Sequence, residues 1–506
     1  MISPVGAGDT LSIIDLLVIG GGINGVGVAR DAVGRGLSVT LAESGDLAGA
    51  TSSYSSKLIH GGLRYLENFE FRLVSEALAE RETLLTIAPH LVWPARFIMP
   101  HVPELRPRWM IRTGLFLYDH LGRRTRLPGS SAVRLDSGVF HDGLRDQYRH
   151  GFIYSDCRAD DARLVIANAI DAQQRGATIL PRTAVLNAQR RHDHWVVQLS
   201  NGRSLKARSI VNAAGPWVKE VLNNRLKVPS SDSIRLVRGS HLVMPKLYAG
   251  DHAFILQNDD RRVIFMIPYE GRFTLVGTTD VVETGDPAHP VATDAEAEYL
   301  CRAIGRFLAK PSHPGDAVHR FAGVRPLYDD GSGDPSSITR DYTLRVDHEQ
   351  DAAPVLSIFG GKLTTYRRLA EQVVDKIEPF VAGTPLQGSG WTGSQVLPGG
   401  DFGSGGLAKF RTDLANAYPW LDQPHCHSLL RRHGSRIHEL LDGARDQNDL
   451  GQNFGGNLTE REVEWFRRHE WANSADDILW RRSKCGLHMS VTQREAFADY
   501  ITASTH

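Results

Sequence analysis

The sequence has 506 residues, 41% of them hydrophobic and 23% charged, which suits a globular protein with sizeable apolar cores in more than one domain. Lysine plus arginine and aspartate plus glutamate both number 58, so no overall charge recruits nucleic acid or an anionic surface, and any electrostatic role must be local. The four cysteines are scattered without C-x-x-C spacing, which indicates reduced thiols in a cytoplasmic-type compartment.

The N-terminal segment, Met1 to Ile14, contains no lysine or arginine. It therefore lacks the basic region of a secretory signal and the arginine-rich face of a transit peptide. No apolar run approaches the ~20 residues that a membrane-spanning helix needs. If the protein meets a membrane, we expect it to lie on the surface.

The segment from Asp15 to Glu43 is typical of one β-turn-α-β unit. Leu16 to Ile19 is an apolar run suited to a strand buried on both faces, and the residues from Gly20 to Gly25 then match G-x-G-x-x-G. In such a unit the first glycine permits a tight turn, the second lets the backbone approach a pyrophosphate, and the third packs the helix against the strand. We expect that helix from about Ile23 to Arg35, with its N-terminal N–H groups facing the anion.

The second strand of this unit, Leu37 to Leu41, leads to Glu43. A carboxylate at this position suits the ribose hydroxyls of a dinucleotide and disfavours a 2′-phosphate. The unit therefore predicts a dinucleotide site, with an ordinary glycine turn as the alternative. The motif alone does not separate FAD from NAD.

A hydroxyl-rich loop, Ala50 to Ser56, comes next and is followed by a glycine turn at Gly61-Gly62. Its simplest interpretation is a polar surface loop. Hydroxyls and backbone amides are also what the middle of a bound dinucleotide requires, and Arg64 with Tyr65 could present charge to a substrate.

Capping and turn signals predict the elements that follow. Asp160-Asp161 predicts a helix that runs to about Arg175, and Trp195 to Val211 predicts a hairpin turning at Asn201-Gly202. β-rich runs between Ser231 and Asp347 predict an antiparallel sheet, which we expect Val92 to His150 to join. Val355 to Phe359 is expected as the last buried strand of the nucleotide domain.

The C-terminal part begins after Thr384 to Gly405, a linker rich in glycine, proline and serine. Thr459-x-x-Glu462 and Ser490-x-x-Gln493 predict capping boxes that open helices, within a helical domain that carries no catalytic signature. His425-Cys426-His427 has ligand-type side chains, but no second cluster completes four ligands, so we expect no metal site.

Several motifs together resemble the aerobic, FAD-dependent glycerol-3-phosphate dehydrogenases, which belong to the amino-acid-oxidase-like flavoproteins. They include GGGINGVG at 20–27, YSDCRADDARL at 154–164, VNAAGPWVK at 211–219, GTTD at 277–280, GVRPLYDD at 323–330 and FGGKLTTYRRLAE at 359–371. The resemblance implies an α/β fold in which a Rossmann-like FAD-binding domain is interleaved with an antiparallel-sheet substrate domain, followed by an all-helical C-terminal domain. The expected boundaries are 1–91, 151–230 and 348–383 for the FAD-binding domain, 92–150 and 231–347 for the substrate domain, 384–405 for the linker and 406–506 for the helical domain.

This resemblance implies oxidation of sn-glycerol 3-phosphate to dihydroxyacetone phosphate by hydride transfer to flavin N5, with electrons passing from non-covalent FAD to a membrane quinone. Alternatives are an oxidase that delivers electrons to O2 and a non-catalytic flavin-binding protein. The expected location is the cytoplasmic face of the inner membrane, nucleic acid is not expected as a partner, and a homodimer stays open.

The resemblance also implies roles for particular residues. The implied cofactor contacts are Gly20, Gly22, Ile23, Asn24, Gly25, Glu43, Thr51, Ser52, Ser56, Lys57, Leu58, His60, Gly61, Gly62, Gly215, Gly361, Lys362, Leu363 and Thr364. The implied substrate contacts are Arg64, Tyr65, Arg325, Lys362 and Arg340, of which Arg340 could instead pair with Asp341.

Three of the residues are catalytic candidates: Lys362, Arg64 and His241. Lys362 is expected near the reacting hydroxyl, and it can reinforce a helix N-terminus in stabilising negative charge on reduced flavin. His241 is the candidate proton acceptor because an imidazole titrates near neutral pH. The alternatives are a hydrogen-bonded core histidine for His241 and a solvated strand arginine for Arg325.

The stretch from Arg106 to Arg126 is the one local charge anomaly, with six arginines against the single acid Asp119 around Trp109 and Phe116. A basic, aromatic helix suits the headgroup boundary of an anionic membrane. A core helix with a solvated basic end is the alternative, and the resemblance to a quinone-reducing family favours the membrane.

Overall fold

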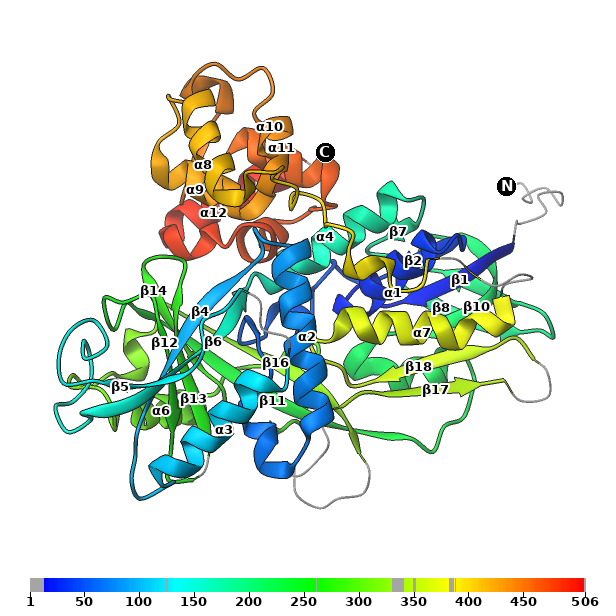
Figure 1. The fold of residues 1–506 in the computed structure, drawn as a ribbon. Coiled ribbons are helices and arrows are strands. Elements are labelled where there is room, and N and C mark those ends of the chain that lie inside the picture. The colour runs from blue at the N-terminus through cyan, green and yellow to red at the C-terminus, as the bar shows by residue number, and fades with distance from the viewer. Residues whose placement is uncertain are drawn as a thin grey trace.

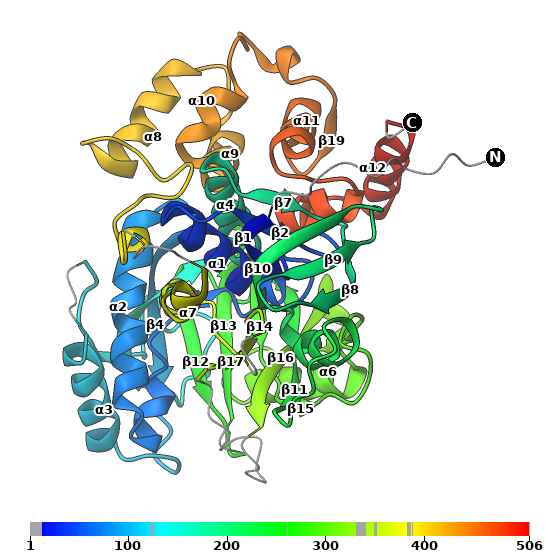
Figure 2. The same ribbon diagram turned by 90° about the vertical axis from the view of Figure 1, so that its right-hand side faces the viewer.

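The structure is a computed structural model that describes residues 13–122, 126–260, 262–329, 341–348, 352–381, 386 and 388–504. Two sheets lie side by side, and a mainly helical C-terminal domain packs against one end of both (Figures 1 and 2). The predicted α/β fold with a helical C-terminal domain is confirmed.

The nucleotide sheet has the order β17-β18-β10-β1-β2-β7, in which every pairing is parallel except the one between β17 and β18 at the edge. Its strands are β1 (Ile13–Ile19), β2 (Val39–Ala42), β7 (Thr178–Leu180), β10 (Ser204–Asn212), β17 (Thr343–Asp347) and β18 (Val355–Phe359). The predicted hairpin that turns at Asn201-Gly202 is formed by β9 (Trp195–Leu199) and β10, and β8 (Val185–Arg190) pairs with β9.

Three helices cover this sheet: α1 (Ile23–Gly34), α4 (Asp161–Gln174) and α7 (Tyr366–Val381). Asp160 caps α4 by accepting a hydrogen bond from the Arg163 amide at 3.1 Å, as predicted. At Gly25 a Cβ atom would lie 1.9 Å from the Gly20 carbonyl oxygen, so only glycine allows α1 to approach β1 this closely. The short apolar strands are thus enclosed in a helix-covered core.

The substrate sheet has the order β15-β11-β14-β13-β12-β4-β6-β3, with β16 paired to β11 and β5 paired to β6. Its strands are β3 (Leu58–Ile59), β4 (Val92–Pro100), β5 (Ser131–Arg134), β6 (His150–Ala159), β11 (Ser233–Pro245), β12 (Ala253–Gln257), β13 (Val263–Tyr269), β14 (Phe273–Gly277), β15 (Val281–Val282) and β16 (His319–Asp329). All pairings are antiparallel except β4 with β12. Three helices pack on this sheet: α2 (Phe71–Ile87), α3 (Arg108–His120) and α6 (Asp294–Gly305).

Three strands lie outside the domain that the expected boundaries gave them. β3 pairs with β6 and belongs to the substrate sheet, although 1–91 was expected in the nucleotide domain. β6 pairs with β4 over nine residues and belongs to the substrate sheet, although 151–230 was expected in the nucleotide domain. β17 pairs with β18 and belongs to the nucleotide sheet, although 231–347 was expected in the substrate domain. Apolar alternation predicts a strand but carries no information on which sheet the strand joins.

The C-terminal domain comprises α8 (Gly406–Ala417), α9 (Gln423–His433), α10 (Ile437–Leu440), α11 (Glu460–His469), α12 (Val491–Ala503) and the small hairpin β19 (Asn453–Gly455) and β20 (Leu458–Thr459). The capping box predicted at Ser490 and Gln493 forms. The one predicted at Thr459 does not, because Glu462 is fully buried and pairs instead with Arg432 and His433, both at 2.8 Å.

Short helical turns complete the chain. They are α5 (Val218–Glu220), the π-helical segments Val221–Arg225 and Asp477–Arg482, and the 3-10 turns Thr51–Ser53, Leu63–Asn68, Gly215–Trp217, Pro314–Asp316, Trp391–Gly393, Gly434–Arg436, Gln447–Leu450 and Cys485–His488.

Candidate active site

A cavity of about 850 Å³ lies between the two sheets, where the turn after β1 meets the strands β11 and β16. This volume falls within the roughly 300–1,000 Å³ that is typical of small-molecule and cofactor sites. The predicted site residues that line it are Gly20, Gly22, Ile23, Asn24, Glu43, Thr51, Ser52, Ser56, Leu58, His60, Gly62, Arg64, Tyr65, Gly215, His241, Arg325, Gly361, Lys362, Leu363 and Thr364. Segments that are hundreds of residues apart in the sequence thus meet in one cavity.

Three predicted cofactor contacts stand behind the cavity wall instead. Gly25 lies under the Gly20 carbonyl, and the Gly61 amide donates to the Tyr118 hydroxyl at 2.8 Å. Lys57 is buried, and its Nζ donates to both carboxylate oxygens of Asp161 at 2.9 Å. These three residues support the segments that line the cavity but do not line it themselves. The last predicted contact, Arg340, lies outside the described residues.

The nucleotide end of the cavity is built from backbone amides around one carboxylate. Glu43 Oε2 accepts from the Gly21 amide at 2.6 Å, and Oε1 accepts from the Gly45 amide at 2.7 Å. The Ile23 amide at the start of α1 donates to Ser52 Oγ at 3.0 Å, and no side chain caps that helix at Gly22. The remaining N–H groups of this helix end suit a pyrophosphate.

The substrate end of the cavity holds three cationic side chains. Lys362 Nζ is buried without a hydrogen-bond partner and lies 4.2 Å from the centroid of the Tyr65 ring. Arg64 has no ion pair among the described residues. Arg325 Nη2 donates to Asp280 Oδ1 at 2.7 Å and to the Thr279 carbonyl at 3.0 Å.

Arg325 reaches the cavity where a glycine of the neighbouring strand leaves space for its guanidinium. Gly239 of β11 lies opposite Gly323 of β16, two pairs along from Val237 and Arg325 and so on the same face of the sheet. A Cβ atom at Gly239 would come within 2.8 Å of Arg325 Nη2. Gly239 therefore leaves the space that the Arg325 guanidinium occupies, and Gly323 leaves space for Tyr54.

His241 lies on the same face of β11 as Gly239. Its ring stacks on Phe321 with centroids 4.9 Å apart, and its Nε2 lies 2.9 Å from Ser56 Oγ. Burial, together with the positive charges of Lys57 and Arg325, lowers the pKa of His241 to about 3. The expectation that this imidazole titrates near neutral pH is therefore wrong for this environment, and the ring is neutral at physiological pH.

The cavity wall also contains residues that were not predicted. Asp280, the partner of Arg325, ends the GTTD motif, and Asp46 follows Glu43 by three positions. Arg481 comes from the C-terminal domain, which has no motif that points to a cavity. Asp341, the expected alternative partner of Arg340, does not line the cavity and accepts from Arg72 Nη2 at 2.6 Å.

The residues present fit a flavin dinucleotide. The unpartnered buried atoms Lys362 Nζ and Asn24 Oδ1 both belong to cavity-lining residues, so a ligand can supply the partners that the protein does not. Gly215 adopts a φ of +54°, and no atom lies within 4 Å of where its Cβ would be, so backbone is exposed to the cavity there. The fit therefore extends from the nucleotide end to the substrate end.

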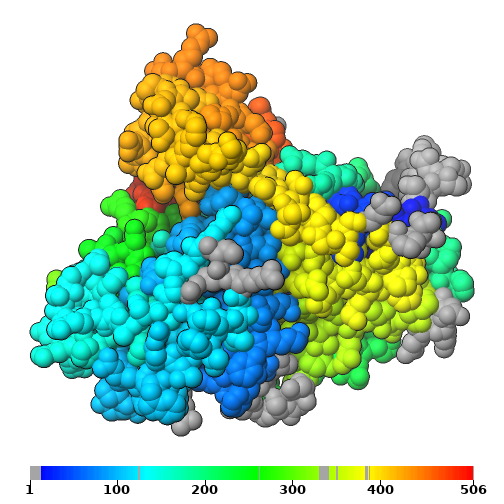
Figure 3. Space-filling model, viewed as in Figure 1, coloured from blue at the N-terminus to red at the C-terminus, as the bar shows by residue number. Residues whose placement is uncertain are grey.

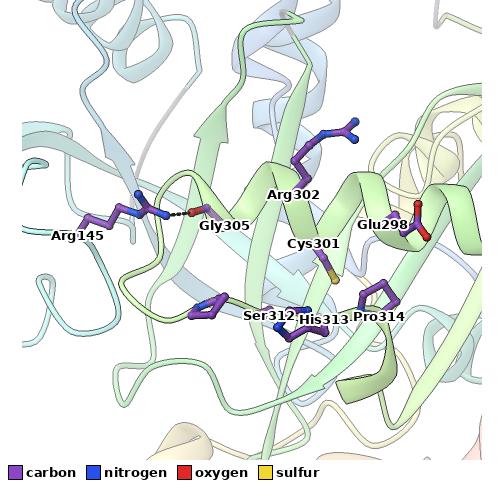
Figure 4. Close-up of a pocket in the computed structure, with 9 residues that line it drawn as sticks. Arg145, Glu298, Cys301, Arg302, Gly305, Ser312, His313 and Pro314 are labelled. Carbon is purple, nitrogen blue, oxygen red and sulfur yellow. Dashed lines mark hydrogen bonds between the residues drawn. The ribbon is translucent and has the colours of Figure 1, made fainter.

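A second cavity, of about 300 Å³, lies beside α6 and shares no lining residue with the first (Figure 4). Arg145 on its wall donates to the carbonyls of Gly305 at 2.7 Å and Leu308 at 2.9 Å. Its guanidinium thus connects the end of α6 and the loop that follows it to the segment after β5. We therefore assign Arg145 a structural role.

Comparison with known proteins gives two family matches. Residues 15–367 match the family described as FAD dependent oxidoreductase, and residues 391–503 match the C-terminal domain of alpha-glycerophosphate oxidase.

Relatives of similar length accompany these matches. The chain is 51% identical to a glycerol-3-phosphate dehydrogenase of Pseudomonas aeruginosa over 97% of this chain and 95% of the relative. It is 48% identical to a D-erythritol 1-phosphate dehydrogenase of Brucella abortus, over 96% and 97%, and 47% identical to the aerobic glycerol-3-phosphate dehydrogenase of Escherichia coli, over 97% and 98%. The solved structure of a Bacillus halodurans glycerol-3-phosphate dehydrogenase complexed with FAD is similar with a TM-score of 0.73 and 26% identity, covering 97% of this chain and 90% of that one.

Proposed function

The chain belongs to the FAD-dependent oxidoreductase family, and on that premise we propose that it oxidises sn-glycerol 3-phosphate to dihydroxyacetone phosphate and passes the electrons to a membrane quinone. The observation that carries this proposal is the buried Lys362 ammonium, which faces the Tyr65 ring but has no hydrogen-bond partner among the described residues, in the same cavity as Arg64 and Arg325. An isolated buried ammonium is unfavourable unless an anion accompanies it.

A phosphate dianion matches this set of cations. The guanidinium groups of Arg64 and Arg325 can hold phosphate oxygens in bidentate fashion, which fixes the direction of the carbon chain as well as its charge. Arg325 keeps one N–H group on Asp280 while it does so, and this ion pair fixes the plane of the guanidinium. Lys362 then lies near the hydroxyl that reacts.

Oxidation of a secondary alcohol also needs an acceptor for the hydroxyl proton. His241 is the proposed acceptor because its imidazole is neutral, and Ser56 and Phe321 hold the ring in place. A phosphate bound to Arg325 offsets part of the positive field that lowers the histidine pKa, so substrate binding makes the ring a stronger base. Bound FAD supplies the hydride acceptor.

The proposed membrane contact is the outer face of α3 and the turn before α2. Side chains of α3 alternate between a buried face, formed by Ile111, Leu115 and Tyr118, and an exposed one. The exposed face carries Trp109 (68% exposed) and Phe116 (53%), and Phe69 (76%) lies on the adjoining turn. α3 lies on the surface of the molecule in Figure 3, which argues against the alternative of a core helix.

Charge accompanies these apolar side chains. Arg108 and Arg112 are exposed on α3. Arg106 pairs with Glu67. Arg123 and Arg124 lie outside the described residues. None of the described helices is both long and apolar enough to cross a bilayer. A basic, aromatic face suits contact with an anionic membrane surface, on the cytoplasmic side of the inner membrane.

The catalytic proposal is tested by anaerobic bleaching of the bound flavin. We expect sn-glycerol 3-phosphate to bleach the flavin absorbance within one turnover, erythritol 1-phosphate to do so more slowly, and glycerol hardly at all. A soluble quinone should then restore the absorbance faster than air does. If glycerol 3-phosphate does not bleach the flavin, the proposed substrate is wrong. Faster bleaching by erythritol 1-phosphate would make that compound the substrate. Faster recovery of the absorbance in air than with quinone would indicate an oxidase.

The membrane proposal is tested by sedimentation with anionic vesicles. Replacing Arg108 and Arg112 by Glu removes two favourable charges of ~1 kcal/mol each, so vesicle affinity should fall at least tenfold and turnover with a soluble dye should be kept. The matched control replaces Arg191 and Arg203, two exposed arginines at the hairpin of the nucleotide sheet, by Glu. Equal loss of binding in both variants would place the contact elsewhere.

A further inference from the structure

The C-terminal domain contributes a side chain to the main cavity. Arg481, on the π-helical segment Asp477–Arg482, lines the cavity together with Glu43, Ser44, Gly45 and Asp46 of the loop after β2. Glu43 marks the end of the cavity that suits the adenosine ribose. A domain without any catalytic motif therefore forms part of the nucleotide end.

Asp46 is the centre of this contact. Arg482 donates to both of its carboxylate oxygens, at 2.7 and 2.8 Å, in the two-pronged geometry that arginine and carboxylate prefer. Arg481 Nε donates to Asp46 Oδ2 at 2.6 Å, and Arg481 Nη2 donates to Asp477 at 2.5 Å. Two adjacent arginines of one domain thus hold a single acid of the other.

These groups are buried, which makes the contact specific. Arg482 is 0% exposed and Asp46 is 8% exposed. Loss of one partner of a buried pair leaves the other charge unpaired in a low-dielectric site, which is more damaging than loss of a surface pair. The ion pairs of Asp46 therefore hold the loop after β2 in place, and their arginine partners belong to the C-terminal domain.

Other ion pairs support the same interface. Arg163 at the start of α4 pairs with Glu470, Lys484 pairs with Asp160, and Arg182 pairs with Asp477. They attach the π-helical segment and its neighbours to the nucleotide domain at three further points.

We propose that the C-terminal domain is a structural part of the FAD site: Arg481 and Arg482 hold the loop after β2 through Asp46 and complete the adenosine end of the cavity. The proposal rests on membership of the FAD-dependent oxidoreductase family and is independent of the substrate. Because binding free energies are reciprocal, FAD in turn strengthens the attachment of the C-terminal domain.

The first test measures the rate of FAD release from the holoenzyme, by the fluorescence of the freed flavin after dilution. Arg481→Gln and Asp46→Asn should each raise the release rate about tenfold. The double variant should release FAD no faster than the more affected single variant, because both changes break one contact. The matched control is Arg461→Gln, which removes an arginine that bonds only to carbonyls within the C-terminal domain.

The proposal is wrong if the Arg481 and Asp46 variants release FAD at the same rate as the control variant. It is also wrong if the two effects add in the double variant. A second test needs no variant. Hydrogen exchange of the wild-type protein should slow at Asp477–Arg482 when FAD binds, as well as at the loop after β2. Protection limited to the nucleotide domain would contradict the reciprocal coupling.

Discussion

The two ends of the main cavity differ in how their charged groups are bonded. At the nucleotide end, Glu43 accepts two backbone amides and Asp46 accepts two arginines. At the substrate end, Lys362 Nζ is buried without a hydrogen-bond partner, and Arg64 has no ion pair among the described residues. The carboxylates of the nucleotide end are thus bonded within the protein, whereas the substrate end holds positive charge that a ligand can neutralise.

This difference separates two uses of a buried charge. A carboxylate that is fully bonded holds the backbone in one shape, so its removal should harm the fold even without ligand. A buried ammonium that has neither a hydrogen-bond acceptor nor a counter-ion opposes folding, so its removal should harm catalysis and spare the fold. The four predictions that follow test this contrast, from the largest expected effect to the smallest.

The largest effect is expected from Lys362→Met. The variant loses a positive charge that is proposed to lie beside the reacting hydroxyl, and loss of one such electrostatic contribution typically lowers turnover by about 10²–10³-fold. The free energy of unfolding without substrate should stay the same or rise, because an unpaired buried charge is gone. Steady-state kinetics and urea unfolding measure the two effects.

Lys376→Met is the matched control for this variant, because Lys376 is exposed on α7. A clear fall in the stability of Lys362→Met relative to this control would show that Lys362 has a structural partner, and the contrast between the two ends would then be lost.

The opposite result is expected at Glu43. Glu43→Gln leaves one of the Gly21 and Gly45 amides with a neutral acceptor and the other facing an NH2 group that cannot accept, so the apoprotein should lose ~1–3 kcal/mol of unfolding free energy before any substrate is present. Chemical denaturation measures this loss, and Glu298→Gln on the exposed side of α6 is the control. An apoprotein as stable as the wild type would mean that the loop is held without Glu43.

A pH-dependent effect is expected from His241. Its pKa is about 3 in the folded protein, below its ordinary value of 6.5, so between these values the unfolded chain binds the extra proton. The stability that depends on the neutral ring is present above pH 6.5 and is lost as the pH falls. His241→Asn should therefore lower the slope of unfolding free energy against pH by up to ~1.4 kcal/mol per unit below pH 6.5.

Urea midpoints between pH 5 and 8 measure this slope. The exposed histidine variant His289→Asn should keep the wild-type slope. If His241→Asn kept it as well, the ring would be accessible to protons in the folded protein.

The smallest effect is expected at Tyr118, behind the substrate end. Its hydroxyl accepts from the Gly61 amide at 2.8 Å and donates to the buried Asp156, so α3 holds the turn that carries Arg64 and Tyr65. Tyr118→Phe should cost about 1 kcal/mol in that turn and raise KM for the phosphorylated substrate several-fold, with kcat changed less. Tyr248→Phe, which removes a buried hydroxyl bonded to two backbone carbonyls elsewhere, should leave KM unchanged. Equal changes in both variants would assign Tyr118 a general packing role.

Much of the nucleotide end was predictable from sequence because its signals are local. The glycine turn, the helix that follows and Glu43 lie within 24 residues, from Gly20 to Glu43, and the structure confirms the predicted elements. Lys57 was expected to contact the cofactor, but its partner Asp161 lies 104 positions away and no local pattern indicates the pair.

The same limit applies to longer contacts. Arg481 lies 435 positions from Asp46. The alternation of apolar and polar residues predicts β6 and β17 as strands but does not indicate which sheet each strand joins. The neutral state of His241 follows from burial and from the charges of Lys57 and Arg325, which only the folded structure brings together.

The most direct test of the central claim compares two substrates in Arg325→Ala. If the cations of the substrate end bind a phosphate, this variant should lose ~2–4 kcal/mol of transition-state stabilisation with sn-glycerol 3-phosphate. That loss corresponds to a fall of about thirty-fold to eight-hundred-fold in kcat/KM. Turnover of glycerol, already poor, should hardly change, and Arg325→Lys should recover only part of the loss because an ammonium lacks the two-pronged geometry. Equal loss with both substrates, at full FAD content, would mean that Arg325 acts on the cofactor or the fold, and would contradict the assignment of the substrate end as a phosphate site.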